Sequence, residues 1–231
     1  MSTIEKNIAK VGARIREAAQ AVGREPATVG LLAVSKTQPA AAIRDAFAAG
    51  LRDFGENYLQ EALDKQAELD DLPLTWHFIG PIQSNKTKAI AEHFDWVHSV
   101  DRLKIAQRLS DQRPAALPPL NICLQVNVSG EASKSGCAPQ EVQQLARAIT
   151  ALPRLRLRLR GLMCIPAPSE DPAEQRAAFA RLRQLRDELA LDLDTLSMGM
   201  SQDLEAAIAE GATWVRIGTA LFGARDYGRP Q

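Results

Sequence analysis

The sequence has no net charge and few cysteines, and both features exclude some classes of function. Its 231 residues carry 28 basic and 28 acidic side chains, so no global field would draw it to nucleic acid or to an anionic membrane. We expect neither as a partner. The three cysteines, Cys123, Cys137 and Cys164, form no CxxC pair and cannot all pair within one chain. They indicate that the protein folds in a reducing compartment. We interpret them as small buried side chains and not as nucleophiles.

Long apolar runs and metal-ligand spacings are also missing. No apolar run approaches the length of a membrane span, and residues 1–20 lack the apolar core and cleavage site of a secretory signal. We therefore expect a cytoplasmic protein. His77, His93 and His98 show neither a metal-ligand spacing nor an obvious acidic partner. We predict no metal site, and we interpret these histidines as ordinary hydrogen-bonded residues.

Short apolar runs recur along the chain, and helix-like segments separate most of them. Near-continuous apolarity is typical of parallel strands that are buried on both faces. Eight candidate strands cover residues 29–35, 51–55, 76–80, 96–100, 121–127, 157–165, 195–198 and 214–218. Helical patterns cover residues 40–49, 140–152, 172–191 and 202–210, and residues 3–22 form an additional helix before the first strand.

This order of elements predicts an α/β fold, a single (β/α)8 TIM-type barrel with an extra N-terminal helix. The main alternative is an open doubly wound sheet, but no GxGxxG dinucleotide motif follows the first strand. No Pro- or Gly-rich linker divides the chain, so we expect one domain over residues 1–231.

Residues 154–160 alternate arginine and leucine, which would place four guanidinium groups on one face of a strand. One interpretation is an anion site. The other, which we favour, is a solvent-facing or ion-paired approach to the sixth strand, because most of these arginines precede the expected barrel core.

Function in such a barrel gathers at the C-terminal ends of the strands. Lys36 directly follows the first strand, where partial desolvation would free its amine to attack a carbonyl. A solvated lysine, or one paired with a carboxylate, is the alternative. Glu56 and Asn57 follow the second strand, so we expect both polar side chains at the same rim.

Two anion-binding features lie in the loops after the seventh and eighth strands. Ser201 stands at the start of the helix at 202–210, where backbone N–H groups favour an anion, although it could simply cap that helix. Gly218 permits close backbone approach after the eighth strand, and Thr219 adds a hydroxyl. Because barrels often bind phosphate between these two loops, the sequence predicts a phosphate ligand.

Six motifs together closely resemble the pyridoxal phosphate homeostasis protein family, also called the YggS/PROSC family. The matching segments span residues 31–222, nearly the whole chain, and the full set in this order is highly specific. The motifs are AVSKT (33–37), FGENY (54–58), HFIG (77–80), QSNK (83–86), SMGMS (197–201) and VRIGT (215–219).

The resemblance implies a barrel like the N-terminal domain of alanine racemase, with pyridoxal 5′-phosphate (PLP) as the cofactor. It implies that Lys36 holds PLP as a Schiff base, that Arg216 lies beside the pyridine nitrogen and that Asn57 lines the pocket. It also places the phosphate of PLP near a set of three residues: Ser201, Gly218 and Thr219.

Two further positions bear on how PLP is handled. Lys134 matches a family lysine thought to take part in PLP handling, whereas Gln38 stands where many members have a second lysine. The cationic Arg216 beside the pyridine nitrogen would disfavour its protonation and weaken the electron sink. Racemases of this fold also use arginine, so this feature does not exclude catalysis.

The resemblance implies a PLP carrier or buffer that maintains intracellular PLP homeostasis without catalytic turnover, not an enzyme. The alternatives are a PLP-dependent amino-acid racemase or related fold-type III enzyme, and a barrel whose Lys36 is only structural. Alanine racemases need a second domain with a catalytic tyrosine. We expect no such domain here, because Gln231 follows the barrel closely and Tyr58 and Tyr227 lie outside any such region. As partners we expect PLP and transient contacts with PLP-dependent apoenzymes, made by a monomer.

Overall fold

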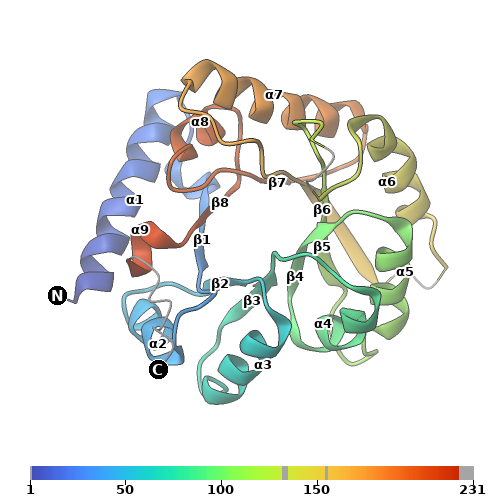
Figure 1. The fold of residues 1–231 in the computed structure, drawn as a ribbon, viewed down its shortest axis with the longest axis horizontal. Coiled ribbons are helices and arrows are strands. Elements are labelled where there is room, and N and C mark those ends of the chain that lie inside the picture. Colours follow the sequence, from blue (N-terminus) through green and yellow to red (C-terminus); the bar gives the residue numbers. More distant parts are fainter. Residues whose placement is uncertain (1, 132–134, 154–155, 224–231) are drawn as a thin grey trace.

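The centre of the protein is a closed barrel of eight parallel strands, seen in a computed structural model that describes residues 2–131, 135–153 and 156–223 (Figure 1). The strands follow one another in sequence order, and the last pairs with the first. They are β1 (Gly30–Val34), β2 (Asp53–Glu56), β3 (Thr75–Phe78), β4 (Trp96–Val100), β5 (Leu120–Gln125), β6 (Leu157–Met163), β7 (Thr195–Ser197) and β8 (Trp214–Ile217). Each overlaps one predicted run, so the TIM-type barrel is confirmed.

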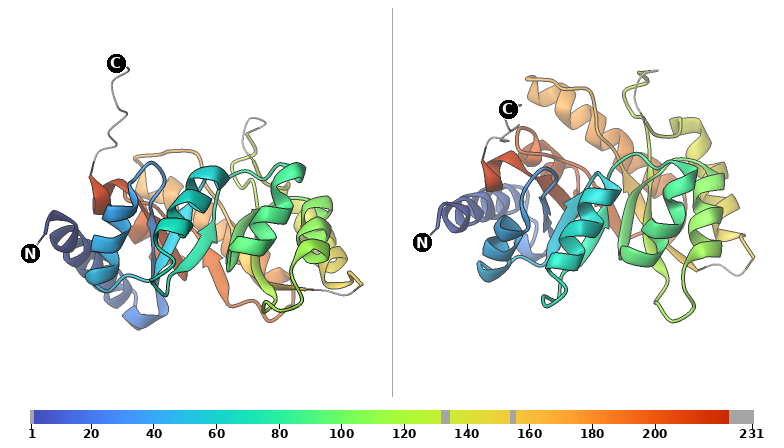
Figure 2. Two further views of the ribbon diagram at one scale, coloured as in Figure 1. Left: turned by 90° about the horizontal axis from the view of Figure 1, so that it is seen from below. Right: turned by 60° about the horizontal axis from the view of Figure 1, so that its bottom comes forward.

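Helices cover the outside of the barrel, as Figures 1 and 2 show. They are α1 (Thr3–Ala21), α2 (Ala40–Ala48), α3 (Leu59–Glu68), α4 (Thr87–His93), α5 (Leu103–Gln112), α6 (Val142–Thr150), α7 (Pro172–Glu188), α8 (Leu204–Ala209) and α9 (Thr219–Phe222). Five of them, α1, α2, α6, α7 and α8, lie within the segments predicted as helical. The other four were not predicted from the sequence.

The extra N-terminal helix α1 is confirmed, and its sequence explains both its start and its position. Ser2 and Glu5 form a capping box, in which each side chain accepts a hydrogen bond from the other residue's backbone N–H. Val11, Ile15 and Ala19 recur at helical spacing and are buried against the barrel's outer layer. The helix contacts α8 and α9, which follow β7 and β8 (Figure 1).

The two faces of the strands differ in chemistry. The outward residues join one large apolar core beneath the helices, and Phe54 and Val97 in this core are completely buried. Because side chains alternate along a strand, the neighbouring positions face into the barrel. There, Trp96, Cys123 and Met163 form a separate apolar cluster. The buried interior also contains polar side chains, which the site described below uses.

No helix among the described residues is long and apolar enough to cross a membrane. The described arginines of the 154–160 segment support the solvent-facing or ion-paired interpretation, and Arg158 is exposed. Arg156 precedes β6 and donates to the carbonyls of the loop at 114–117. Arg160 pairs with Asp194 at 2.7 Å, and its guanidinium lies over the ring of Trp96. Residues 154 and 155 lie outside the described residues.

Candidate functional site

One cavity lies at the C-terminal ends of the strands, where the fold is expected to place function. Its volume is about 530 Å³, within the range of roughly 300–1,000 Å³ typical of small-molecule sites. It is lined by residues from β1 and β8, from the loops that follow β1, β2, β3, β6, β7 and β8, and from the first turns of α7 and α9. All six residues predicted to bind the cofactor line it: Lys36, Asn57, Ser201, Arg216, Gly218 and Thr219.

Lys36 is half-buried two residues past the end of β1, and the structure anchors the residue before it. The hydroxyl of Ser35 donates to Glu56 Oε1 over 2.6 Å. Lys65, on α3, donates to the carbonyl of Ser35 over 2.7 Å and to the same oxygen of Glu56 over 2.8 Å. All three partners are buried, so they hold the backbone from which the Lys36 side chain extends.

The residue after Lys36 is anchored by the same network. The backbone N–H of Thr37 donates to Glu61 Oε1 over 2.6 Å, and Glu61 also pairs with Lys65. Thr37 has a φ of 63°, in the left-handed region that costs free energy for a residue with a β-branched side chain. Hydrogen bonds on both sides of Lys36 therefore stabilise a strained turn that presents its amine to the cavity.

The expectation that Glu56 stands at the rim was wrong. Its carboxylate is completely buried beside Lys65 of α3, a helix that was not predicted from the sequence. Burial raises the pKa of Glu56, and the nearby ammonium of Lys65 opposes that rise. Glu56 therefore acts beneath the site and does not line the cavity.

Arg216 provides a buried cation at the cavity. Its side chain is almost fully buried near the end of β8 and donates to Ser197 Oγ over 2.8 Å and to the carbonyl of Cys164 over 2.9 Å. Burial lowers the pKa of Arg216, but a guanidinium starts high enough to remain charged. The cavity thus has a permanent positive charge whose orientation is fixed by two hydrogen bonds.

The loop after β7 reaches the cavity, but not in the way expected. Helix α8 begins at Leu204, and its N-cap is Asp203. Ser201 therefore lies before the helix and does not cap it. Asp203 closes the turn instead, since its Oδ1 accepts from the N–H of Met200 at 2.6 Å. Arg14 of α1 donates to the Ser201 carbonyl over 3.0 Å, so the N-terminal helix positions this loop.

The loop after β8 starts a helix at the cavity. Gly218 is the N-cap of α9, which begins at Thr219, so backbone N–H groups and a hydroxyl lie together there. A Cβ on Gly218 would lie 3.2 Å from the carbonyl oxygen of Val34, which is a tight contact with the backbone of β1. Glycine thus allows the first and last strands to meet beside Lys36.

Asn57 contributes a polar atom that has no partner within the described part of the protein. Among the described residues, its buried Oδ1 accepts no hydrogen bond. An unpaired buried acceptor costs free energy, so this atom is suited to a donor on a ligand. Its position depends on Gly80, where a Cβ would lie only 2.3 Å from the carbonyl oxygen of Asn57.

The expectation that the histidines have no acidic partner was wrong for His77. His77 and His98 are buried and hydrogen-bonded, as expected, but His77 does have an acidic partner, Asp53, at 3.0 Å. The two residues are 24 positions apart in sequence, and the parallel register of β2 and β3 brings them together. Sequence spacing alone contained no signal for this pair.

Two lysine-related expectations have different outcomes. Lys134 lies outside the described residues. Gln38 is half-buried and lines a small neighbouring pocket that shares Lys36, Gly218 and Thr219 with the cavity. A glutamine amide therefore lies near Lys36, at the position where the resemblance implies a second lysine in many family members.

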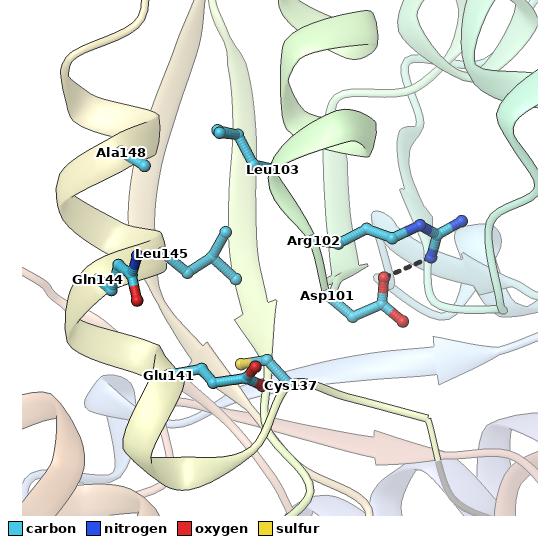
Figure 3. Close-up of a pocket in the computed structure, with 8 residues that line it drawn as sticks. All are labelled: Asp101, Arg102, Leu103, Cys137, Glu141, Gln144, Leu145 and Ala148. Atoms are coloured by element: carbon cyan, nitrogen blue, oxygen red, sulfur yellow. Dashed lines mark hydrogen bonds and ion pairs between the residues drawn. The ribbon is translucent and has the colours of Figure 1, made fainter.

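A second cavity of about 280 Å³ lies between α5 and α6 (Figure 3). Its charged groups have partners within the protein: Arg102 pairs with Asp101, and Glu141 accepts from the N–H of Ala138. Burial raises the pKa of the lining thiol of Cys137 to about 12, so it is not a nucleophile near neutral pH. Burial has the same effect on Cys123 and Cys164.

The comparisons with known proteins agree with this geometry. The family model of the alanine racemase N-terminal domain matches residues 7–226. A pyridoxal phosphate homeostasis protein from Pseudomonas aeruginosa is 80% identical over 230 residues, which cover 100% of this chain and 99% of that protein. This chain belongs to the pyridoxal phosphate homeostasis protein family. Another member, from Escherichia coli K12, is 54% identical over 99% of this chain and 100% of its own length.

Solved structures extend the comparison to the family's fold and ligand. PipY of Synechococcus elongatus PCC7942, solved with PLP bound, is 42% identical and superposes with a TM-score of 0.84, covering 96% of this chain and all of its own. The alanine racemase of Corynebacterium glutamicum has a TM-score of 0.64 at 18% identity, and this chain covers 62% of it. That second likeness concerns the fold alone.

Proposed function

We propose that this protein binds PLP covalently through Lys36 and serves to buffer and supply the cofactor without catalytic turnover. One observation carries the proposal: an amine, a buried guanidinium and two loops suited to an anion surround a single cavity of suitable size. The naming of its relatives as homeostasis proteins and the PLP-bound structure of PipY support the same ligand and role.

Each predicted site residue has a distinct task in this proposal. The amine of Lys36 condenses with the aldehyde carbon of PLP, forming a C=N bond and releasing one water molecule. Ser201, the backbone at Gly218 and the Thr219 hydroxyl hold the phosphate, with α9 directing its first N–H groups toward the anion. Arg216 faces the pyridine nitrogen, and the unpaired Oδ1 of Asn57 accepts a hydrogen bond from the ligand.

The charge of Arg216 bears on how strongly bound PLP can act as an electron sink, although racemases of this fold share that arginine. PLP, when bound, supplies an aldehyde for attachment and a ring that can accept electrons. A buried cation beside the pyridine nitrogen disfavours protonation there, so the ring withdraws electrons less strongly. Racemisation also needs a second base, and no tyrosine is among the described residues that line the cavity. Tyr58 lies outside the lining, and the residue is 55% exposed.

We also propose that the protein acts in the cytoplasm. All three cysteines are free and buried, as expected for a protein that folds in the reducing cytoplasm. We propose that the protein acts as a monomer and meets PLP-dependent apoenzymes only transiently. The cavity remains open at the rim, where Ile165 and Met200 expose apolar side chains beside it.

The decisive experiment is to locate the covalent bond. Borohydride reduction of the PLP-loaded protein followed by mass spectrometry should find one pyridoxyl group, on Lys36. Lys36→Ala should lose both the adduct and the visible absorption band, whereas Lys88→Ala, which removes an exposed lysine on α4, should keep them. An adduct on another lysine, or a retained band in Lys36→Ala, would refute the assignment.

A further inference from the structure

A continuous chain of hydrogen bonds crosses the interior of the barrel and ends at Arg216. Asp53 contacts His77 Nε2 at 3.0 Å, and His77 Nδ1 contacts His98 Nε2 at 2.9 Å. His98 Nδ1 contacts Ser197 Oγ at 2.7 Å, which accepts from Arg216 at 2.8 Å. These five residues come from the strands β2, β3, β4, β7 and β8, so the chain links strands on opposite sides of the barrel.

The direction of every hydrogen bond in this chain follows from its two ends. A carboxylate can only accept, so Asp53 must receive the proton of His77 Nε2. A neutral His77 then accepts at Nδ1, which makes His98 Nε2 a donor and leaves His98 Nδ1 as an acceptor. That nitrogen receives the hydroxyl proton of Ser197, whose oxygen accepts from the guanidinium, a group that can only donate. All donors and acceptors are matched in one arrangement only.

The surroundings keep both imidazoles neutral, which this arrangement requires. Both rings are completely buried, and burial lowers the pKa of His77 and, more strongly, of His98. The ring of His77 stacks on Trp96 with an interplanar angle of 9°, and the edge of Trp214 packs against it. These contacts restrict rotation of the ring, so its two nitrogens remain aimed at their partners.

We propose that Asp53, His77, His98 and Ser197 are positioning residues that orient Arg216 toward the ligand in the cavity. This inference rests on the proposed function. Arg216 has five N–H donors, and its bonds to Ser197 and Cys164 use one on each terminal nitrogen. The chain thereby fixes the plane of the guanidinium, and through it the environment of the cofactor ring. Four residues that do not line the cavity thus determine how the ligand is held.

The chain also couples the cavity to the opposite end of the barrel. Asp53 is the first residue of β2, whereas the cavity lies where the strands end. The side chain of Asp53 is 29% exposed. Its negative charge and the positive charge of Arg216 stand at the two ends of one polarised row of hydrogen bonds. Removal of the charge at Asp53 should therefore be detected at the ligand.

The first test measures the histidine tautomers directly, with or without PLP. The sequence has only three histidines, so long-range ¹H–¹⁵N NMR spectra should resolve His77 and His98 from the exposed His93. Both buried rings should be neutral near pH 7 and carry their proton on Nε2. An Nδ1–H tautomer or a doubly protonated ring at either position would overturn the proposed direction of the chain.

The second test interrupts the hydrogen-bond chain by substitution and measures the affinity and absorption of bound PLP. Ser197→Ala should weaken PLP binding by about tenfold, since a hydrogen bond to a charged group is lost. Asp53→Asn keeps an acceptor for His77 but removes the charge, so it should shift the absorption maximum of bound PLP with a smaller loss of affinity. In both variants the pyridoxyl adduct should remain on Lys36.

The control is Ser110→Ala, which removes another buried hydroxyl, on α5, that accepts from the N–H of Arg156. It should also lower stability, because a buried hydrogen bond is lost, but keep the wild-type affinity and absorption maximum. If Ser197→Ala and Asp53→Asn both keep wild-type values, the chain is only structural and the proposal is wrong. If wild-type protein forms no adduct at all, the proposed function fails, and the tautomers still test the chain separately.

Discussion

Replacement of Lys65 by methionine should destabilise the fold strongly, because it leaves a buried carboxylate without its counter-ion. The side chain of Lys65 is 7% exposed, that of Glu56 is completely buried, and the two are 2.8 Å apart. Removal of one partner from a buried ion pair costs about 3–5 kcal/mol. Methionine retains the length and much of the packing of lysine, so the loss of charge is the main change.

The loss should depend on pH in a defined direction. Burial already raises the pKa of Glu56 above its ordinary value, and Lys65 is the main group opposing that rise. In Lys65→Met the folded-state pKa should therefore lie further above the unfolded value. Such a group penalises folding while it is ionised, so stability should recover as the pH falls through the folded pKa toward the unfolded value.

Urea denaturation of the wild type and the variant at pH 8 and pH 5 would measure both effects. The matched control is Lys88→Met, which removes another lysine that pairs with a glutamate one helical turn away. That lysine is 72% exposed and 3.9 Å from Glu92, so its loss should cost no more than about 0.5 kcal/mol. A loss of about 1 kcal/mol or less for Lys65→Met, or a loss that does not shrink at pH 5, would refute the reasoning.

Three further predictions concern the ligand. Ser201→Ala combined with Thr219→Val should erode the preference for PLP over pyridoxal, since each buried charge-assisted hydrogen bond is worth about 1.5–3 kcal/mol. Titrations of both ligands on the apo protein measure this, and an unchanged preference would place the phosphate elsewhere. The PLP-loaded protein should not racemise L-alanine, and turnover on the order of 1 s⁻¹ or faster would identify it as an enzyme. Gly80→Ala should displace Asn57 and weaken PLP binding, because the added Cβ would lie 2.3 Å from a backbone oxygen; an unchanged Kd would argue against a role for Asn57.

The sequence by itself determined the order of the elements and therefore the fold class. Strands buried on both faces are rich in apolar residues, so the eight runs were visible without knowledge of their neighbours. The residues that follow the strands inherit their place from this order. For that reason Lys36, Gly218 and Thr219 could be assigned to one rim before any contact between them was known. The amphipathic α1 was visible for the same local reason.

Only the tertiary structure decided which polar groups meet. Glu56 was expected at the rim, but its partner Lys65 comes from α3, a helix that was not predicted from the sequence. The link between Asp53 and His77 depends on the register of β2 against β3, and the link between His98 and Ser197 joins residues 99 positions apart. Periodicity reports how one segment faces the core, whereas such pairs arise when separate segments pack, so they exist only in the closed barrel.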